Sequence, residues 1–152
     1  MLRVFLFSLT CTALAACSGG PPAELTATLQ PVPPASGQGV GGSIDRVEYD
    51  AAADKVTVTG WHMLTPKTKL QDLKVYAGNA SAVESISRFE RPDVVTAMGK
   101  NEMLNSGFTL VLKTEPGLPL SELCISINDQ EYGARVLAPA TPEQVRCTSL
   151  GQ

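Results

Sequence analysis

Few side chains of this 152-residue chain are of the types that carry catalysis or bind metals. His62 is the single histidine, and no zinc-ligand or serine-triad pattern surrounds it. The 15 carboxylates could supply a glycosidase pair, which needs two carboxyl groups at a set separation. They are scattered, however, and Asp50 and Asp54, which share a turn, lack the spacing of a calcium loop. We therefore expect no enzyme, no metal and no cofactor, with a small carboxylate-dependent hydrolase of envelope polysaccharide as the alternative.

Aromatic side chains offer a first candidate binding surface. Trp61 and His62, together with Tyr76 and Tyr132, could stack on the apolar faces of sugar rings. The structural interpretation is that Trp61 is the central core residue of the domain and that His62 lies at the surface or rim. Both interpretations stay open at the level of the sequence.

Charged side chains offer a second candidate surface. Arg88, Arg91 and Asp93 could line a polar pocket. The structural interpretation is a salt bridge that locks the Arg-Pro-Asp turn to the sheet. Removal of the Asp93 carboxylate would separate the two, because a lock supports stability and a pocket supports binding.

The first residues have the organisation of a secretory signal. Arg3 is their only charge, an apolar run follows over 4–13, and small residues close the segment. The run is too short to span a bilayer, which needs roughly 20 apolar residues. Leu14-Ala15-Ala16-Cys17 resembles the bacterial lipobox in all four positions. The resemblance implies cleavage after Ala16 and acyl chains on Cys17, and Ser18 in place of aspartate favours the outer membrane over the inner.

Glycine and proline dominate the next segment. We expect residues 17–42 to form the lipidated cysteine and a flexible tether, in which residues 24–29 alternate and could add an edge strand. A tether of this length would leave the orientation of the domain free. Of 12 Lys and Arg, Arg3 would leave with the signal, so 11 would stand against 15 Asp and Glu, a net charge of −4. That balance and the lack of a basic cluster argue against nucleic acid as a partner.

Short alternating runs follow, as in a small all-β domain. They predict a hairpin over 43–61, strands over 70–77, 82–89 and 107–113, and a second hairpin over 123–137. The apolar residues of 82–89 recur every three positions, which allows a strand with a bulge or a turn of helix, and the neighbouring strands favour the strand. Pro92 and Gly99 bound one short helix. We expect a single antiparallel, immunoglobulin-like β-sandwich of about seven strands over residues 43–138.

Two cysteines remain besides the anchor. Cys124 lies in an expected strand, and Cys147 lies in the C-terminal tail, residues 139–152. The signal would send them to an oxidising compartment, where an isolated pair usually joins. We therefore expect a Cys124–Cys147 disulfide that pins the tail to the domain.

Four landmarks resemble those of a bacterial envelope β-sandwich module that also occurs beside polysaccharide machinery. They are Gly42-Ser43-Ile44-Asp45, Gly60-Trp61, Arg91-Pro92-Asp93-Val94 and Gly107-Phe108. Position 62 departs from the module, which has a small residue where this chain has His62. The resemblance implies the fold, and no activity comes with it. The sequence thus predicts a lipid-anchored envelope protein that binds a glycan or a protein; the alternative partner is a secretion or surface-polysaccharide system that it helps to assemble.

Overall fold

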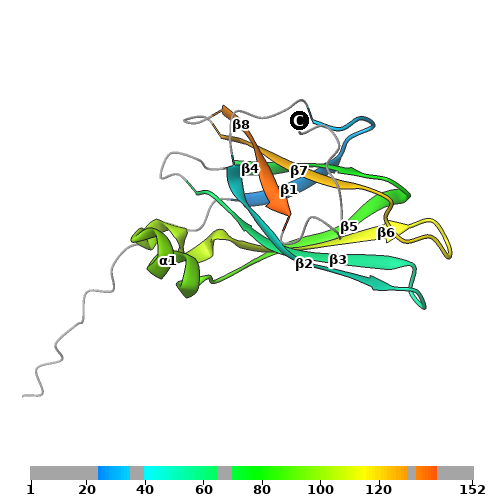
Figure 1. The fold of residues 1–152 in the computed structure, drawn as a ribbon, viewed down its shortest axis with the longest axis horizontal. Coiled ribbons are helices and arrows are strands. Elements are labelled where there is room, and N and C mark those ends of the chain that lie inside the picture. The colour runs from blue at the N-terminus through cyan, green and yellow to red at the C-terminus, as the bar shows by residue number, and fades with distance from the viewer. Residues whose placement is uncertain (1–23, 35–39, 65–69, 130–132, 140–152) are drawn as a thin grey trace, which may run out of the picture.

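The computed structural model describes residues 24–34, 40–64, 70–129 and 133–139, and these residues are mostly β-strand (Figure 1). The elements in chain order are β1 (Glu24–Leu29), β2 (Val40–Asp50), β3 (Lys55–His62), β4 (Leu70–Ala77), β5 (Ala80–Phe89), α1 (Pro92–Met98), the 3₁₀ helix η1 (Asn101–Ser106), β6 (Gly107–Thr114), β7 (Leu123–Asp129) and β8 (Gly133–Pro139).

The strands form one sheet rather than the two packed sheets of a sandwich. Their order is β1-β4-β7-β8-β2-β3-β6-β5, and the edge strands β1 and β5 lie against each other, so that the sheet nearly closes into a barrel. The all-β prediction is confirmed, whereas the two-sheet prediction is wrong. Alternating strands bury one face in either arrangement, so the pattern alone could not separate the two.

The pairing also differs from a purely antiparallel sheet. β1 pairs with β4, and β2 pairs with β8, in parallel. The predicted hairpins are confirmed, because β2 pairs with β3 and β7 pairs with β8 in antiparallel register. Of the two alternatives for residues 82–89, the bulged strand is the one present: β5 has a register shift between Val83 and Ser85, and both Val83 and Ile86 pack against the core.

The core fills the inside of the closing sheet. Its largest fully buried members include Phe108, Leu73, Leu110 and Ile125. In β3 the burial alternates strictly from Lys55 onward, with every second residue buried. A period of two therefore sets the inner and outer faces, as expected for strands with one buried side.

The tether prediction does not hold for all of residues 17–42. Residues 24–29 form β1, and residues 40–42 belong to β2, whereas 17–23 and 35–39 lie outside the described residues. β1 is the edge strand that the alternation allowed. Thr26 and Thr28 donate hydrogen bonds to Asp72 on β4 over 2.9 and 3.0 Å, which fastens this edge strand to the sheet.

One short helix is present as predicted. Pro92 fills its first turn, where the missing N–H costs nothing, and Gly99 ends it in the left-handed conformation that glycine adopts without penalty. η1 was not predicted. Both helices lie between β5 and β6, so they cap one end of the sheet, at the left of Figure 1.

We call this end of the sheet the helical end. β3 and β5 finish there and β6 begins there, next to the two helices. The pairing directions also place the first residues of β1, β2, β4 and β8 at the helical end. The β2–β3 turn and the segment between β6 and β7 lie at the opposite end (Figure 1).

Candidate functional site: two polar clusters at the helical end

The two aromatic candidates at the end of β3 point to opposite faces. His62 is fully buried and its ring lies 6.1 Å from the Phe108 ring, centroid to centroid. Trp61 is half-buried on the outer face. The structural interpretation, with His62 at the surface and Trp61 as the central core residue, is therefore wrong for both residues. The alternation that begins at Val56 continues through the end of the strand, so position 62 faces the interior and position 61 faces outward.

An inward cluster forms around Arg88 of β5. Its guanidinium donates to the Oε1 of Gln71 over 2.9 Å and to the backbone oxygen of Asn105 over 2.9 Å. It also lies 3.1 Å from the Nε2 of His62. These partners belong to β4, η1 and β3, so one side chain ties three elements together inside the sheet.

The contacts of Arg88 define the tautomer of His62. A guanidinium can only donate, so Nε2 is the acceptor and carries no proton. Nδ1 then carries the proton and donates to the backbone oxygen of Met63 over 3.0 Å. The side-chain amide of Gln71 donates to the same oxygen over 3.2 Å. Both ring nitrogens of His62 are thus engaged in hydrogen bonds.

The burial of Arg88 carries an electrostatic cost. Desolvation lowers the pKa of its guanidinium, although an arginine remains charged in proteins. The hydrogen bonds to His62, Gln71 and Asn105 offset that cost. A histidine engaged in this way positions other groups and has no ring nitrogen to offer as a general base. The cluster is therefore suited to holding the helical end together.

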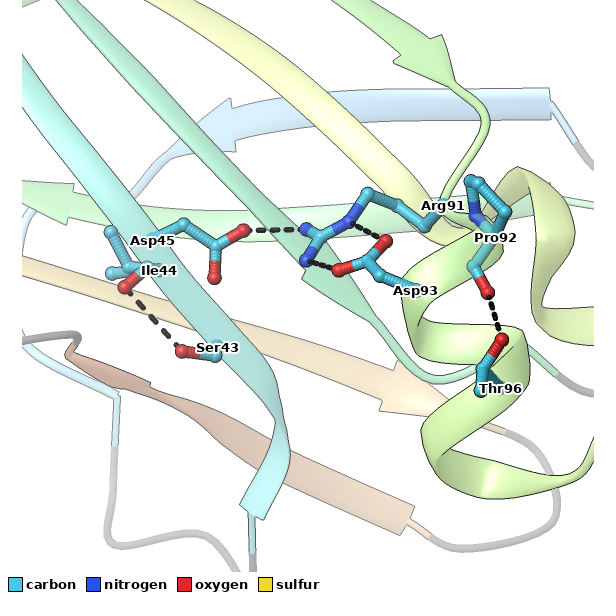
Figure 2. Close-up of polar contacts among 7 residues, drawn as sticks. All are labelled: Ser43, Ile44, Asp45, Arg91, Pro92, Asp93 and Thr96. Carbon is cyan, nitrogen blue, oxygen red and sulfur yellow. Dashed lines mark hydrogen bonds and ion pairs between the residues drawn. The ribbon is translucent and has the colours of Figure 1, made fainter.

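An outward cluster forms around Arg91, just beyond β5. Figure 2 shows its guanidinium between two carboxylates. It contacts Asp93 of α1 over 2.6 and 2.8 Å and Asp45 of β2 over 2.5 Å. Its backbone N–H donates to the oxygen of Leu104 in η1. The predicted lock between the Arg-Pro-Asp turn and the sheet is thus present, and Asp45 completes it.

The electrostatics of this outward cluster favour the charged forms. The hydrogen bonds from Arg91 lower the pKa of Asp93 to about 2. The carboxylate of Asp93, together with Asp45, raises the pKa of Arg91. The side chain of Arg91 is 14% exposed, whereas that of Asp93 is 63% exposed, so solvent screens the pair on one side.

Gly107, the first residue of β6, provides room for this cluster. A Cβ placed there would lie 2.9 Å from the Cγ of Arg91 and 2.7 Å from the backbone oxygen of Phe89. The guanidinium of Arg91 also lies 6.0 Å from the centre of the Phe89 ring. Only a residue without a side chain lets the arginine lie this close to the strand.

The candidate residues from the sequence do not form one surface. Arg88 and His62 face the interior, while Trp61, Arg91 and Asp93 lie on the outside. Tyr76 is on β4, four places from β3 in the sheet, and its hydrogen bond to Glu122 raises its pKa. Tyr132, Ala16, Cys17 and Cys147 lie outside the described residues. The polar pocket expected for Arg88 with Arg91 and Asp93 is therefore split between two faces.

Two members of these clusters were missed by the sequence reasoning. Gln71 is a polar residue at a buried position of β4, where it receives Arg88. Asp45 was noted as part of a landmark but not as a partner of Arg91. The alternation of β4 could have placed Gln71 inside. No local signal could have found Asp45, because its partner lies 46 residues away.

Within the described ranges, no group of three or more His, Cys, Asp and Glu side chains is placed to hold a metal ion. None of the helices in those same ranges has both the length and the apolar character needed to cross a membrane. No protein-family model, curated protein or solved structure matches the chain.

Proposed function

We propose that this protein is a cell-envelope lipoprotein whose domain is a non-catalytic binding or scaffolding module for a glycan or a protein partner. The observation that carries the proposal is the sequence Leu14-Ala15-Ala16-Cys17 at the end of a short apolar segment. Acyl chains on Cys17 would supply the attachment, because two or more chains bind a membrane far more durably than one. Ser18 after the cysteine favours the outer membrane.

The arrangement of the domain supports this proposal. The first strand among the described residues begins at Glu24, downstream of the proposed cleavage site. His62, the single histidine, is buried with both ring nitrogens in hydrogen bonds, which disfavours a histidine-dependent reaction. Asp45, Asp72 and Asp93 each contact a cationic side chain, and Asp72 also accepts hydrogen bonds from β1. Such carboxylates support the fold.

Metabolic labelling with a fatty-acid analogue tests the anchor. Wild-type protein should incorporate label and remain in the membrane fraction, whereas Cys17→Ala should do neither. Cys11→Ala is the matched control, because Cys11 lies inside the proposed signal and should be dispensable for labelling. Label on the Cys17→Ala protein would refute the proposed anchor.

A second test addresses the partner. Crosslinking in native membranes followed by mass spectrometry, and co-sedimentation with purified cell-wall polysaccharide, separate a protein from a glycan ligand. Trp61→Ala tests whether the outer face contributes, and the exposed Leu118→Ala on the opposite end is the control. Hydrolysis of the polysaccharide during co-sedimentation would instead favour the carboxylate hydrolase.

A Cys124–Cys147 disulfide belongs to the same proposal. Cys124 lies on the outer face of β7, opposite the core residues Leu123 and Ile125, yet it is 2% exposed. Closing a loop of this length stabilises by about 3 kcal/mol in the chain-entropy model. Peptide mapping without reductant should recover the two cysteines in one linked peptide, and two unlinked peptides would contradict the pairing.

A further inference from the structure

We propose that the helical end of the sheet faces the membrane surface that anchors the protein. This inference rests on the proposed lipidation of Cys17 and adds an orientation to it. Two observations carry it: the place at which β1 begins, and the direction in which β1 runs. The partner is the lipid surface itself, reached through the short stretch of chain between anchor and strand.

The chain between the anchor and the fold is short. Only six residues, Ser18 to Ala23, separate Cys17 from Glu24, where β1 begins. Fully extended, this stretch spans at most about 25 Å. A random coil of this length spans about 15 Å on average. A tether that ran from residue 18 to 42 would have left the domain free to turn over, and β1 removes that freedom.

The direction of β1 places its first residue at the helical end. β1 is parallel to β4 from the pair Glu24 and Leu70 to the pair Leu29 and Val75. β4 in turn is antiparallel to β7, which fixes its direction in the sheet. The chain therefore enters the fold at the same end as α1, η1 and the Arg88 and Arg91 clusters.

β1 is held firmly enough to act as the attachment point. Burial raises the pKa of Asp72, but the hydrogen bonds from Lys74, Thr26 and Thr28 outweigh it and lower the pKa overall. The charged carboxylate of Asp72 thus accepts hydrogen bonds from both threonines of β1. The apolar side of the strand, Leu25, Ala27 and Leu29, packs against the core. If β1 left the sheet, these hydrogen bonds and apolar contacts would all be lost at once.

The inverted orientation demands more chain than is present. An eight-residue strand such as β3 spans roughly 25 Å. With the opposite end on the membrane, Glu24 would lie about that far above the lipid, so the tether would have to run almost fully extended. Full extension of any chain is opposed by its conformational entropy. The β2–β3 turn and the loop that carries Leu118 therefore project away from the membrane.

Fluorescence energy transfer from tryptophan to an acceptor on lipid headgroups tests the orientation in the mature, lipidated full chain reconstituted in vesicles. Trp61 is the only tryptophan and pairs with Gly107 at the helical end, so the wild-type protein already carries the near donor. The far donor is Leu118→Trp in a Trp61→Phe background, at an exposed position of the opposite end. We expect severalfold stronger transfer from the near donor.

Equal transfer from the two donors, or stronger transfer from the far donor, would overturn the orientation while leaving the anchor intact. Failure of the protein to float with the vesicles would instead overturn the anchor. A third chain carries a long Gly-Ser insertion between Gly19 and Gly20. We expect it to float normally and to lose the difference between donors; a persisting difference would show that the short tether is not its cause.

A measurement on the unaltered chain guards against variants that fail to fold. A photo-crosslinker on the lipid headgroup, followed by peptide mass spectrometry, should mark residues 92–106 several times more often than residues 50–55 and 115–120. The reverse ratio would overturn the proposed orientation.

Discussion

Arg88 and Arg91 lie three residues apart, and the sheet treats them in opposite ways. Arg88 turns inward and donates to neutral acceptors on Gln71 and Asn105, beside the buried His62. Arg91 turns outward and pairs with Asp45 and Asp93. Arg88 links β5 to β3, β4 and η1, whereas Arg91 links the turn after β5 to β2 and α1. Both clusters therefore hold separate elements together, in two different environments.

The difference shows what burial does to an arginine. Inside, the acceptors on Gln71 and His62 belong to buried side chains, so the loss of the guanidinium would remove a donor that water cannot readily replace. Outside, water can replace much of what Arg91 supplies to its carboxylates. We therefore expect the inward cluster to be costly to break and insensitive to salt, and the outward cluster to be cheaper and dependent on pH and ionic strength.

The largest expected effect is that of Arg88→Met. It removes a donor from the oxygens of Gln71 and Asn105 and from Nε2 of His62. Gln71 and His62 are buried, and a buried acceptor left without a donor costs about 1–3 kcal/mol. We expect the free energy of unfolding in urea to fall by about 3 kcal/mol or more.

Two variants calibrate that loss. Arg88→Lys keeps the charge but loses the planar fork, so it should fall between wild type and Arg88→Met. Arg46→Met removes an exposed arginine paired with Glu48 and should change stability by less than about 0.5 kcal/mol. Equal losses of stability for Arg46→Met and Arg88→Met would show that the inward cluster stabilises the fold no more than an exposed ion pair does.

Gly107→Ala is expected to cause the next largest loss of stability. The added Cβ would contact the oxygen of Phe89 and the Cγ of Arg91 at distances that require the neighbours to move. Overpacking of this kind costs about 1–3 kcal/mol. A double-mutant cycle with Arg91→Ala, read by urea denaturation, should show coupling, because alanine has no Cγ to displace. If the two losses of stability simply add, the added Cβ clashes only with Phe89 and not with Arg91.

The end of β3 shows most clearly what could be predicted from the sequence and what could not. Alternation over Val56, Val58 and Gly60 correctly predicts the strand and also places position 62 inside. The polarity of histidine suggested the surface, and the size of Trp61 suggested the core, so residue type misled where periodicity was right. Buried His62 contacts Arg88, and a contact with a residue 26 positions away leaves no local trace in the sequence.

α1 is determined by residues within it and beside it, whereas the closing of the sheet is determined by residues far apart in the sequence. Pro92 and Gly99 act through their own backbone, so the helix could be predicted locally. The closing of one sheet depends on β1 pairing with β4 in parallel across 46 residues. The Gly- and Pro-rich surroundings of residues 24–29 favoured a tether, and only the partner strand makes them a strand.

Arg91→Ala should have a smaller effect than Arg88→Met at neutral pH. The side chain is 14% exposed, so it loses packing as well as charge, and we expect a loss of about 1–2 kcal/mol. The loss should shrink in concentrated salt, which screens the wild-type pairs. Chemical denaturation in urea at low and high salt measures both quantities. A salt-independent loss would indicate that packing over Phe89, rather than the ion pairs, stabilises this corner.

The smallest expected effect is the loss of stability caused by Asp93→Asn, and this loss should depend on pH. The folded-state pKa of Asp93 is about 2, below the ordinary value of 3.8. Between these values the folded protein binds fewer protons than the unfolded chain, so the contribution of Asp93 is fully present above about pH 4 and is lost as pH falls through about 2. Asp93→Asn should thus be less stable than wild type at pH 6, and the two should converge toward pH 2. Thermal unfolding across this range measures the convergence, and a constant gap would mean that the outward cluster works through hydrogen bonds that asparagine cannot mimic rather than through the charge.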